Sequence, residues 1–340
     1  MINIGIIGYG YWGPNLVRNF NETKGISVCQ VSDLEEKKLQ LVRARYPRID
    51  ITTESDEIIY NKSIDAVVIA TQVSTHYELA LKSLNAGKHV LIEKPMADSS
   101  KKCEELIKLA NNKNLLLMVD HTFAYTSAVR KIKEIITRGE LGRILYYDSV
   151  RVNLGLFQHD VNVIWDLAVH DLSILEYLFN KQPLSISATG ISHIRDQLEN
   201  VAYITLFFEN SLIAHIHVNW MSPVKIRRTL LGGDKKMIVY DDLEPAEKVK
   251  IYDKGIHTFE NDESIYNMKV GYRMGDMWAP NLDNTEALFR LTNHFRDCIH
   301  GKDEPVTNSL SGLRVVRMME AATISMGNNG KPEKFNTRIL

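Results

Sequence analysis

The chain begins with a short apolar run that leads into a glycine-rich turn, and this combination restricts the fold more than any other feature. Residues 2–7, INIGII, have the apolar and β-branched character of a buried strand. The string GYGYWG follows, with Gly8, Gly10 and Gly13, and Pro14 stands where a helix would begin. A strand, a tight glycine turn and a helix in this order are typical of the first unit of a dinucleotide-binding fold.

The following hundred residues repeat this alternation of strand and helix. The apolar runs ISVCQVSD, DAVVIAT, KHVLIEKP and LLLMVDH are separated by stretches of helical periodicity, such as 35–46 and 76–86. Strands that alternate with helices predict a parallel sheet with crossover helices. We therefore expect residues 1–120 to form a Rossmann domain. Within it the glycine motif, which is weak evidence in isolation, becomes strong evidence for a dinucleotide.

The pattern changes after residue 120. One helix is predicted over about 127–138, closed by Gly139, and long alternating strands follow, among them VAYITLFF, LIAHIHVNW and KMIVYDD. Two more helices are predicted near the end, over about 285–300 and 309–326. Residues 121–340 are thus expected to form an α+β domain with a mostly antiparallel, open-faced sheet. No repeat or Gly- and Ser-rich linker marks the boundary, which rests on the change of pattern alone.

Composition narrows the classes of partner. The 340 residues, 44% of them hydrophobic, can bury the cores of two domains. Forty-one basic and forty-two acidic residues leave no bulk charge to attract nucleic acid or an anionic membrane. No apolar run approaches the roughly 18 residues of a membrane span, and the first residues lack the features of a signal peptide. Three widely spaced cysteines fit a reduced, cytoplasmic compartment.

Asp33 is the residue that points to the identity of the dinucleotide. It closes the second strand, twenty positions past Gly13. A carboxylate at this point can hydrogen-bond both hydroxyls of the adenosine ribose, and its charge would repel a 2'-phosphate. We therefore expect NAD rather than NADP. The alternative is that Asp33 only caps the helix that follows it.

The triplet Glu93, Lys94 and Pro95 ends the fifth predicted strand. Ligands of open parallel sheets bind outside the carboxyl ends of the strands, so Lys94 is expected to face the crevice that holds the dinucleotide. Pro95 restricts Lys94 to extended conformations and thereby limits where its side chain can point. The alternative is an ordinary surface lysine that happens to follow a strand.

A polar stripe marks the predicted helix DLAVHDLSILEY. At about 100° per residue, Asp166, His170, Ser173 and Tyr177 fall on one face of this helix. The stripe fits the wet side of an amphipathic helix, and the helix taken alone favours this explanation. A carboxylate one turn before an imidazole is also an arrangement that supports acid–base chemistry. The helix by itself does not decide between the two.

Four segments together resemble the glucose–fructose oxidoreductase, inositol dehydrogenase and MocA family: GYGYWG, HVLIEKP, VDHTFAYTSAVRKIKE and DLAVHDL. The resemblance runs through most of the chain, as far as SGLRVVRMMEAA. It implies an NAD(P)-dependent oxidoreductase with a Rossmann domain and a C-terminal sheet domain. The open face of that sheet usually forms the oligomer, which here implies a homodimer or homotetramer. By position, Lys94, Asp166 and His170 match the catalytic trio of the family.

The chemistry of alcohol oxidation agrees with that assignment. Moving a hydride from a secondary alcohol to nicotinamide leaves a hydroxyl proton to be removed, and histidine titrates closest to working pH. His170 is therefore the expected base. Asp166 would orient its ring, and the Lys94 ammonium would hold the substrate oxygen as negative charge develops. Tyr177, two turns further on, is expected to be structural.

The full set of predicted binding residues is as follows. The cofactor is expected to contact Gly8, Gly10, Tyr11, Trp12, Gly13, Asp33, Thr71, His76, Glu93 and Lys94. The substrate is expected to contact Lys94, His121, Arg151, Asn162, Asp166, His170 and Arg273. No metal is expected. His215 and His217 stand at strand spacing with Asn219, but no third ligand is within sequence reach.

The substrate is the least constrained part of the prediction. Many relatives have a glycine triplet before the catalytic aspartate and an acidic residue three positions after the histidine, where this chain has DVNVIWD and Ser173. The contacts of inositol and free-sugar members therefore cannot be carried over. The segments NLGLFQHDVNVIWDLAVHDLS and GYRMGDMWAP resemble members from pathways of unusual cell-surface sugars. That resemblance implies a nucleotide-activated sugar such as UDP-N-acetylglucosamine or its uronic acid, oxidised at C3.

A sugar nucleotide needs local cations for its diphosphate. Arg151 and Arg273 are the first candidates, and the cluster of Lys225, Arg227 and Arg228 is the second. Three alternatives remain open at this point. The enzyme could reduce a keto-sugar nucleotide, since the same residues serve both directions, or it could oxidise inositol or a free sugar. The third alternative is a non-catalytic protein that senses NAD(H).

Overall fold

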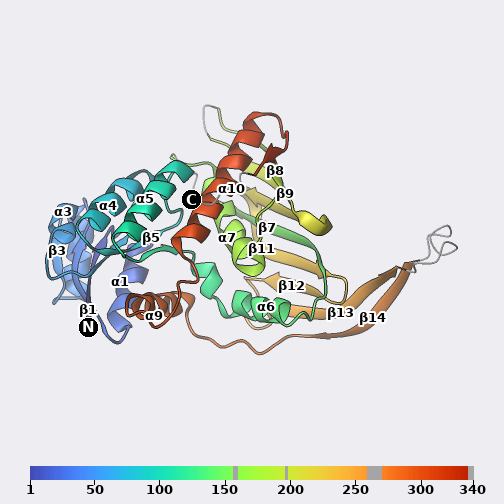
Figure 1. Cartoon of the computed structure of the whole chain (residues 1–340), viewed down its shortest axis with the longest axis horizontal. Coiled ribbons are helices and arrows are strands. Elements are labelled where there is room, and N and C mark those ends of the chain that lie inside the picture. The colour runs from blue at the N-terminus through green and yellow to red at the C-terminus, as the bar shows by residue number, and fades with distance from the viewer. Residues whose placement is uncertain (156–159, 196–197, 259–269, 336–340) are drawn as a thin grey trace. The chain divides into compact units, whose positions relative to one another are not determined.

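The computed structural model describes residues 1–155, 160–195, 198–258 and 270–335. Contacts within the chain divide it into two compact units. The first contains Met1–Thr126 together with Thr285–Arg317, and the second contains Ser127–Asn284 together with the segment that starts at Met318. Figure 1 labels the elements of both units.

A six-stranded sheet forms the centre of the first unit. Its strand order is β3-β2-β1-β4-β5-β6 and every neighbouring pair is parallel, as the alternation of strands and helices predicts. All residues of β4 and β6 are buried, so both faces of the sheet are covered there. The strands are β1 (Ile2–Ile7), β2 (Ile26–Ser32), β3 (Asp50–Thr52), β4 (Ala66–Ile69), β5 (His89–Glu93) and β6 (Leu117–Asp120).

The helices of this sheet lie where the sequence places them. Pro14 is in the first turn of α1, where its missing N–H leaves no hydrogen bond unmade. The helical segments are α1 (Gly13–Glu22), α2 (Glu36–Arg45), α3 (Ser55–Ile59), α4 (Val73–Asn85), α5 (Ser100–Asn112) and the 3-10 turn η1 (Thr122–Tyr125).

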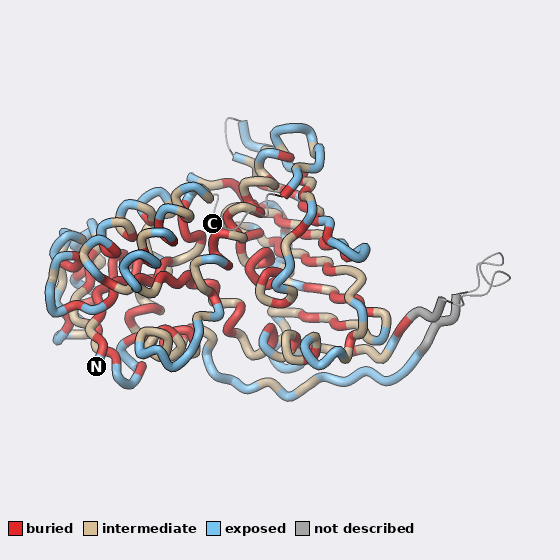
Figure 2. The backbone as a smooth tube through the Cα atoms, viewed as in Figure 1, coloured by how far each residue is buried: buried red, intermediate tan, exposed pale blue. Residues whose placement is uncertain are grey.

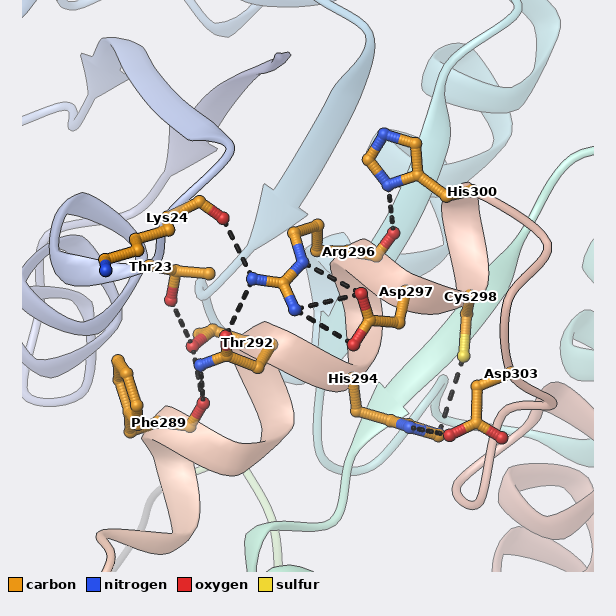
Figure 3. Close-up of polar contacts among 11 residues, drawn as sticks. Thr23, Lys24, Phe289, Thr292, His294, Arg296, Asp297, Cys298, His300 and Asp303 are labelled. Atoms are coloured by element: carbon orange, nitrogen blue, oxygen red, sulfur yellow. Dashed lines mark hydrogen bonds and ion pairs between the residues drawn. The ribbon is translucent and has the colours of Figure 1, made fainter.

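Helix α9 (Ala287–Ile299) belongs to the first unit although it follows most of the second unit in the sequence. Figure 3 shows two of the contacts that hold it. The Thr292 and Thr23 hydroxyls lie 2.8 Å apart, and the Arg296 guanidinium donates to the Lys24 carbonyl at 2.9 Å. The predicted division at residue 120 misses this return of the chain, because helical periodicity does not say which sheet a distant helix covers.

The second unit contains a nine-stranded sheet in the order β14-β13-β12-β11-β7-β10-β9-β8-β15. Among the described residues, seven neighbouring pairs are antiparallel and the pair β7 and β10 is parallel. The sheet is therefore mixed, though largely antiparallel, and the predicted topology is corrected at this one pairing. The strands are β7 (Ile144–Leu154), β8 (Ser185–Ile191), β9 (Val201–Phe207), β10 (Ile213–Asn219), β11 (Met221–Gly233), β12 (Met237–Asp241), β13 (Val249–Thr258), β14 (Val270–Trp278) and β15 (Glu333–Lys334).

One face of this sheet is packed and the other is open. Burial alternates along β9, where Ala202 and Ile204 are buried while Tyr203 and Phe207 are exposed. Figure 2 colours the whole backbone by burial. The helical segments are α6 (Ser127–Thr137), the π-helical turn η2 (Ile164–Ala168), α7 (Val169–Phe179), the 3-10 turn η3 (Glu209–Ser211) and α10 (Ser309–Gly327), which passes from the first unit into the second. No helix in the described part of the chain is long and apolar enough to cross a bilayer.

Candidate active site

The three glycines of GYGYWG have different surroundings. A Cβ at Gly8 would lie 2.4 Å from the Ala70 carbonyl oxygen, and Gly8 has a φ of +101°. A Cβ at Gly13 would lie 2.4 Å from the carbonyl oxygen of Gly8. A Cβ at Gly10 would meet nothing within 4 Å. Gly8 and Gly13 are therefore required for packing, whereas Gly10 leaves its backbone open to the close approach that a pyrophosphate needs.

Asp33 follows β2 directly and is bound to the glycine loop. Its Oδ2 accepts a hydrogen bond from the Tyr9 amide at 2.7 Å, and its Oδ1 accepts one from the Glu35 amide at 2.9 Å. The second bond is part of the turn into α2, so the alternative role of Asp33 at the start of that helix is present as well. The first bond places the carboxylate beside the loop, where the ribose of a dinucleotide is expected.

His76 supports the cofactor edge of the sheet from inside. It is fully buried, and its ring nitrogens lie 2.8 Å from the Pro95 carbonyl oxygen and 3.1 Å from that of Thr71. These carbonyls belong to the segments that follow β5 and β4. The sequence places His76 among the cofactor contacts. The structure instead directs both nitrogens to backbone carbonyls of the segments that follow β5 and β4, one of which accepts the single N–H of the neutral ring.

Two carboxyl groups meet at the ends of β5 and β6. Glu93 and Asp120 are register partners, and Asp120 accepts hydrogen bonds from the Trp12 indole at 3.1 Å and the Thr122 hydroxyl at 2.5 Å. The Lys94 amide donates to the Glu93 carboxylate. Burial raises the pKa of both carboxyls, and the charge of Asp120 raises that of Glu93 further. Asp120 is absent from the predicted site, although its position at the end of a parallel strand was a usable signal.

His121 lies next to Asp120 and is buried without a hydrogen-bond partner for either ring nitrogen. Burial, and secondarily the charge of Lys94, lowers the pKa of His121 to about 3. Its imidazole is therefore neutral at ordinary pH, with one donor and one acceptor nitrogen. This environment is compatible with the predicted substrate contact, since unpaired buried polar groups are uncommon away from ligand sites.

Asp166 belongs to the second unit, where the π-helical turn η2 precedes α7. Asn162 initiates this turn, because its side-chain oxygen accepts from the amides of Ile164 at 3.1 Å and Trp165 at 3.3 Å. Its side-chain nitrogen donates to Glu199 at 3.0 Å. Asn162 is predicted to contact the substrate, but its side chain serves as a helix cap. Single π-helical turns occur frequently at functional sites.

Helix α7, which carries His170, is buried on almost every side. Eight of its eleven residues are buried, among them Ser173 and Glu176. Within the polar stripe only Ser173 is buried, while Asp166, His170 and Tyr177 are partly exposed, so burial does not decide between the two explanations of the stripe. Asp166 accepts a hydrogen bond from the Trp220 indole at 3.0 Å. Trp220 was not singled out from the sequence, where it is only the end of an alternating strand.

Arg151 forms a buried ion pair rather than an open cation. Its guanidinium donates to the Asp171 carboxylate at 2.6 and 3.3 Å, and the Ser149 hydroxyl donates to the same carboxylate at 2.6 Å. Arg151 and Ser149 are on β7, and Asp171 is the residue after His170 on α7. The predicted contact between Arg151 and a diphosphate is not supported, because its charge fastens α7 to the sheet.

The other predicted cations differ in their surroundings. Arg227 and Arg228 pair with Asp242 and Asp241 at 3.3 and 2.8 Å, and Lys225 is exposed. The backbone of Arg273 pairs with Gly255 between β14 and β13, and its side chain lies outside the described residues. Residues 156–159, which belong to the segment used for the substrate prediction, also lie outside them.

The histidine pair on β10 is part of an aromatic stack. Tyr203 stacks on His217 with ring centroids 4.5 Å apart, and His215 lies 3.5 Å from the Asp148 carboxylate. Within residues 1–155, 160–195, 198–258 and 270–335, no group of three or more His, Cys, Asp or Glu residues is arranged to hold a metal ion.

A cysteine, a histidine and an aspartate also meet near the end of α9 (Figure 3). The Cys298 sulfur lies 3.5 Å from His294 Nε2, and His294 Nδ1 lies 3.3 Å from the Asp303 carboxylate. His294 Nε2 already accepts a hydrogen bond from the Val306 amide at 3.1 Å, so it has no lone pair left for a proton. Burial raises the pKa of the Cys298 thiol to about 12. The cluster is therefore structural rather than nucleophilic.

Comparison with known proteins identifies the family of this chain. The model of the NAD-binding Rossmann fold of the GFO_IDH_MocA oxidoreductases matches residues 2–121, and the model of the GFO/IDH/MocA C-terminal domain matches residues 129–239. Two curated relatives are similar over most of the chain. A scyllo-inositol 2-dehydrogenase (NADP(+)) of Bacillus subtilis is 27% identical over 94% of this chain and 92% of its own length. A 2,7-anhydro-N-acetylneuraminate hydratase of Mediterraneibacter gnavus is 26% identical over 89% and 87%.

Two solved structures share the fold. UDP-N-acetylglucosamine 3-dehydrogenase GnnA of Acidithiobacillus ferrooxidans superimposes with a TM-score of 0.80 at 22% identity, over 96% of this chain and 98% of its own. An oxidoreductase of Agrobacterium radiobacter, in complex with NAD+, L-tartaric acid and magnesium, has a TM-score of 0.80 at 18% identity, over 98% of each chain. The family models match more than half of the chain, which therefore belongs to the GFO/IDH/MocA family of NAD-binding oxidoreductases.

Proposed function

We propose that this oxidoreductase is an NAD-dependent dehydrogenase of a nucleotide-activated amino sugar, such as UDP-N-acetylglucosamine or its uronic acid, and that it oxidises the C3 hydroxyl. The assignment as an NAD-dependent dehydrogenase rests mainly on one observation, the arrangement in the first unit of the residues that are expected to hold the cofactor. Gly10 leaves the glycine loop open, and Asp33 stands beside that loop as a ribose acceptor. The negative charge of Asp33 supports NAD over NADP.

The residues of this chain divide the work of the reaction. NAD, when bound, supplies the acceptor for the hydride. We propose that the glycine loop holds its pyrophosphate and that Asp33 holds its adenosine ribose. His170 removes the hydroxyl proton, Asp166 orients the imidazole, and Lys94 holds the substrate oxygen. His121 contributes a neutral hydrogen-bonding group, since burial lowers its pKa.

The assignment of a nucleotide sugar as the substrate is supported by the sequence resemblance. It is also supported by the structural similarity to a UDP-N-acetylglucosamine 3-dehydrogenase, which at 22% identity is a similarity of fold alone. The role in making cell-surface polysaccharide belongs to the same proposal. Other relatives act on inositol or catalyse a hydration, so the substrate must be tested against those classes.

The test is a panel of substrates followed by NADH absorbance. The panel contains UDP-N-acetylglucosamine, its uronic acid, a dTDP-sugar, free N-acetylglucosamine, myo-inositol and scyllo-inositol, each with NAD and with NADP. We expect NADH to form with a UDP-sugar, and expect NAD to give the higher kcat/KM. A free sugar or an inositol that reacts as well as every nucleotide sugar would remove the substrate assignment. NADH binding without turnover of any compound, in either direction, would favour a sensor of NAD(H).

We also propose that the open face of the nine-stranded sheet forms a homodimer or homotetramer. Phe207 of β9 and Ile213 of β10 are register partners, both exposed, and Tyr203 lies on the same face. Paired apolar side chains on an open sheet face favour a subunit interface. Light scattering should show an oligomer for the natural protein and a smaller species for Ile213→Lys. A natural protein that is monomeric at micromolar concentration would contradict the proposal.

A further inference from the structure

Trp220 is the largest fully buried side chain of the second unit, and its place is fixed from three sides. Its amide donates to the Asn200 carbonyl at 2.9 Å, and its carbonyl accepts from the Gly155 amide at 3.0 Å. A Cβ at Gly155 would lie 3.2 Å from the indole Cδ1, so the ring packs closely on the main chain there. A side chain mounted in this way has little freedom to change its rotamer.

The indole N–H of this rigid side chain points at a carboxylate. It donates to Asp166 Oδ2 at 3.0 Å, across 54 positions of sequence. An indole is a donor only and cannot take up a proton. The bond therefore fixes the rotation of the Asp166 carboxylate about the Cβ–Cγ bond.

Asp166 is in a part of the helix that needs such a support. It lies in the π-helical turn, whose hydrogen bonds are less regular than those of the α-helix that follows. The next turn is held separately, by the buried pair between Arg151 and Asp171. The helix is thus held on both sides of His170, at Asp166 by Trp220, which lies between β10 and β11, and at Asp171 by Arg151 of β7.

We propose that Trp220 is a positioning residue that holds the Asp166 carboxylate in a fixed orientation, so that Asp166 can orient the imidazole of His170. The inference rests on the proposed function, since it assigns Asp166 and His170 to the reaction. Trp220 acts through Asp166 and is not required to touch substrate or cofactor.

The chain provides a matched control one residue before Asp166. The Trp165 indole donates to the Thr323 hydroxyl at 3.1 Å, within the same unit. Trp165→Phe therefore removes an indole hydrogen bond from the same helical turn and leaves the carboxylate untouched. Trp220→Phe removes the bond to Asp166 and keeps an aromatic ring in the space.

The experiment measures kcat and KM of both variants across pH, with thermal melting to confirm folding. We expect Trp220→Phe to lower kcat by about tenfold to a hundredfold, with KM for the sugar substrate changed by less than about threefold. A carboxylate that is no longer aimed at His170 stabilises the protonated imidazole less, so the ascending limb of kcat should move to lower pH. Trp165→Phe should keep kcat within about threefold of the natural protein and leave the limb in place.

A double-mutant cycle shows whether Trp220 acts through the carboxylate. In the Asp166→Asn background, Trp220→Phe should cause little further loss of kcat, because the group it positions is already absent. Equal losses from Trp220→Phe in both backgrounds would overturn the proposal. So would a pH limb that stays in place in an active Trp220→Phe enzyme.

Two other results need separate measurements: a Trp220→Phe variant that does not fold, and a natural enzyme that shows no turnover. If Trp220→Phe does not fold, the alternative test is the NMR resonance of the Trp220 indole N–H in isotope-labelled protein. The same resonance frequency in natural and Asp166→Asn protein would contradict the proposal. A natural enzyme without turnover on any compound overturns the proposed function itself. If the natural enzyme is active and Trp220→Phe changes neither kcat nor its pH dependence, only the positioning role of Trp220 is overturned.

Discussion

At the scale of single residues, the carboxyl end of β6 places Asp120 and His121 side by side in a buried environment that disfavours charge on both. Burial raises the pKa of Asp120 and lowers that of His121 to about 3. A neutral imidazole with two unpaired nitrogens at this edge differs from a packed core, where polar atoms find partners. It is compatible with a site completed by its ligands.

His121 should make folding stability depend on pH in a recognisable direction. Its unfolded pKa is about 6.5, so below that pH the unfolded chain binds a proton that the folded protein rejects. Stability contributed by this residue is therefore lost as pH falls from about 6.5 towards 3, by roughly 1.4 kcal/mol per unit. The free energy of unfolding, measured by urea denaturation, should depend less on pH in this range for His121→Asn than for the natural protein. Parallel curves of unfolding free energy against pH for the variant and the natural protein would contradict the prediction. The control is His300→Asn, at an exposed helix end, which should leave the curve unchanged.

Asp33 should set the preference between the two nicotinamide cofactors. Asp33→Asn keeps an acceptor for the Tyr9 amide and removes the charge that would repel a 2'-phosphate. We expect the ratio of kcat/KM for NAD over NADP to fall by about tenfold or more in this variant, in line with the loss of one charge interaction. Cofactor titrations of both proteins measure the ratio. A natural enzyme that already prefers NADP would refute this role of Asp33.

At the scale of elements, helix α7 is attached to β7 through charge rather than apolar packing alone. The Arg151 and Asp171 side chains are both buried, and the Ser149 hydroxyl completes the coordination of the carboxylate. A buried pair is strongly destabilised when one partner is removed, because the other charge is left unpaired.

Removal of one partner and removal of both should therefore differ. Asp171→Ala should lower the free energy of unfolding by about 3 to 5 kcal/mol. The double variant Asp171→Ala with Arg151→Met should recover part of that loss, since no uncompensated charge remains. Urea denaturation of the three proteins gives the comparison. A double variant less stable than Asp171→Ala alone would show that packing, and not charge, dominates the site.

Much of this arrangement follows from local sequence pattern, and the rest does not. The alternation up to residue 120 predicts the parallel sheet, and Gly8 and Gly13 predict the tight turn that their close contacts require. The parallel pairing of β7 with β10 could not be predicted, because strand alternation carries no information on direction. The same limit applies to Trp220 and Arg151, whose roles depend on partners 54 and 20 positions away.

At the scale of the whole molecule, the first unit is completed by a segment from near the end of the chain. Helix α9 contributes Phe295, which is fully buried and meets Phe20 of α1 edge to face at 6.0 Å. The Thr307 hydroxyl donates to the Val119 carbonyl of β6 at 2.7 Å. The dinucleotide-binding unit is therefore discontinuous in sequence, and it can close only after residues 285–317 have been made.

Loss of the Phe295 ring should affect the first unit selectively. Phe295→Ala should lower the free energy of unfolding by about 3 to 5 kcal/mol, through lost burial and the remaining cavity. Hydrogen exchange should accelerate in α1 and α9 more than in β8 and β9 of the second unit. Leu41→Ala, at an exposed position of α2, serves as the control and should change neither. Uniform acceleration across both units would mean that they unfold as one.

The role of His170 in hydride transfer to NAD is the central claim, and one comparison tests it most directly. The measurement is kcat with the best sugar substrate, together with NADH affinity by fluorescence titration, for natural protein and His170→Ala. Loss of the base should lower kcat by about a hundredfold or more while NADH affinity stays nearly unchanged, because the predicted cofactor contacts belong to the first unit and His170 to the second. Near-normal turnover in His170→Ala would contradict the account.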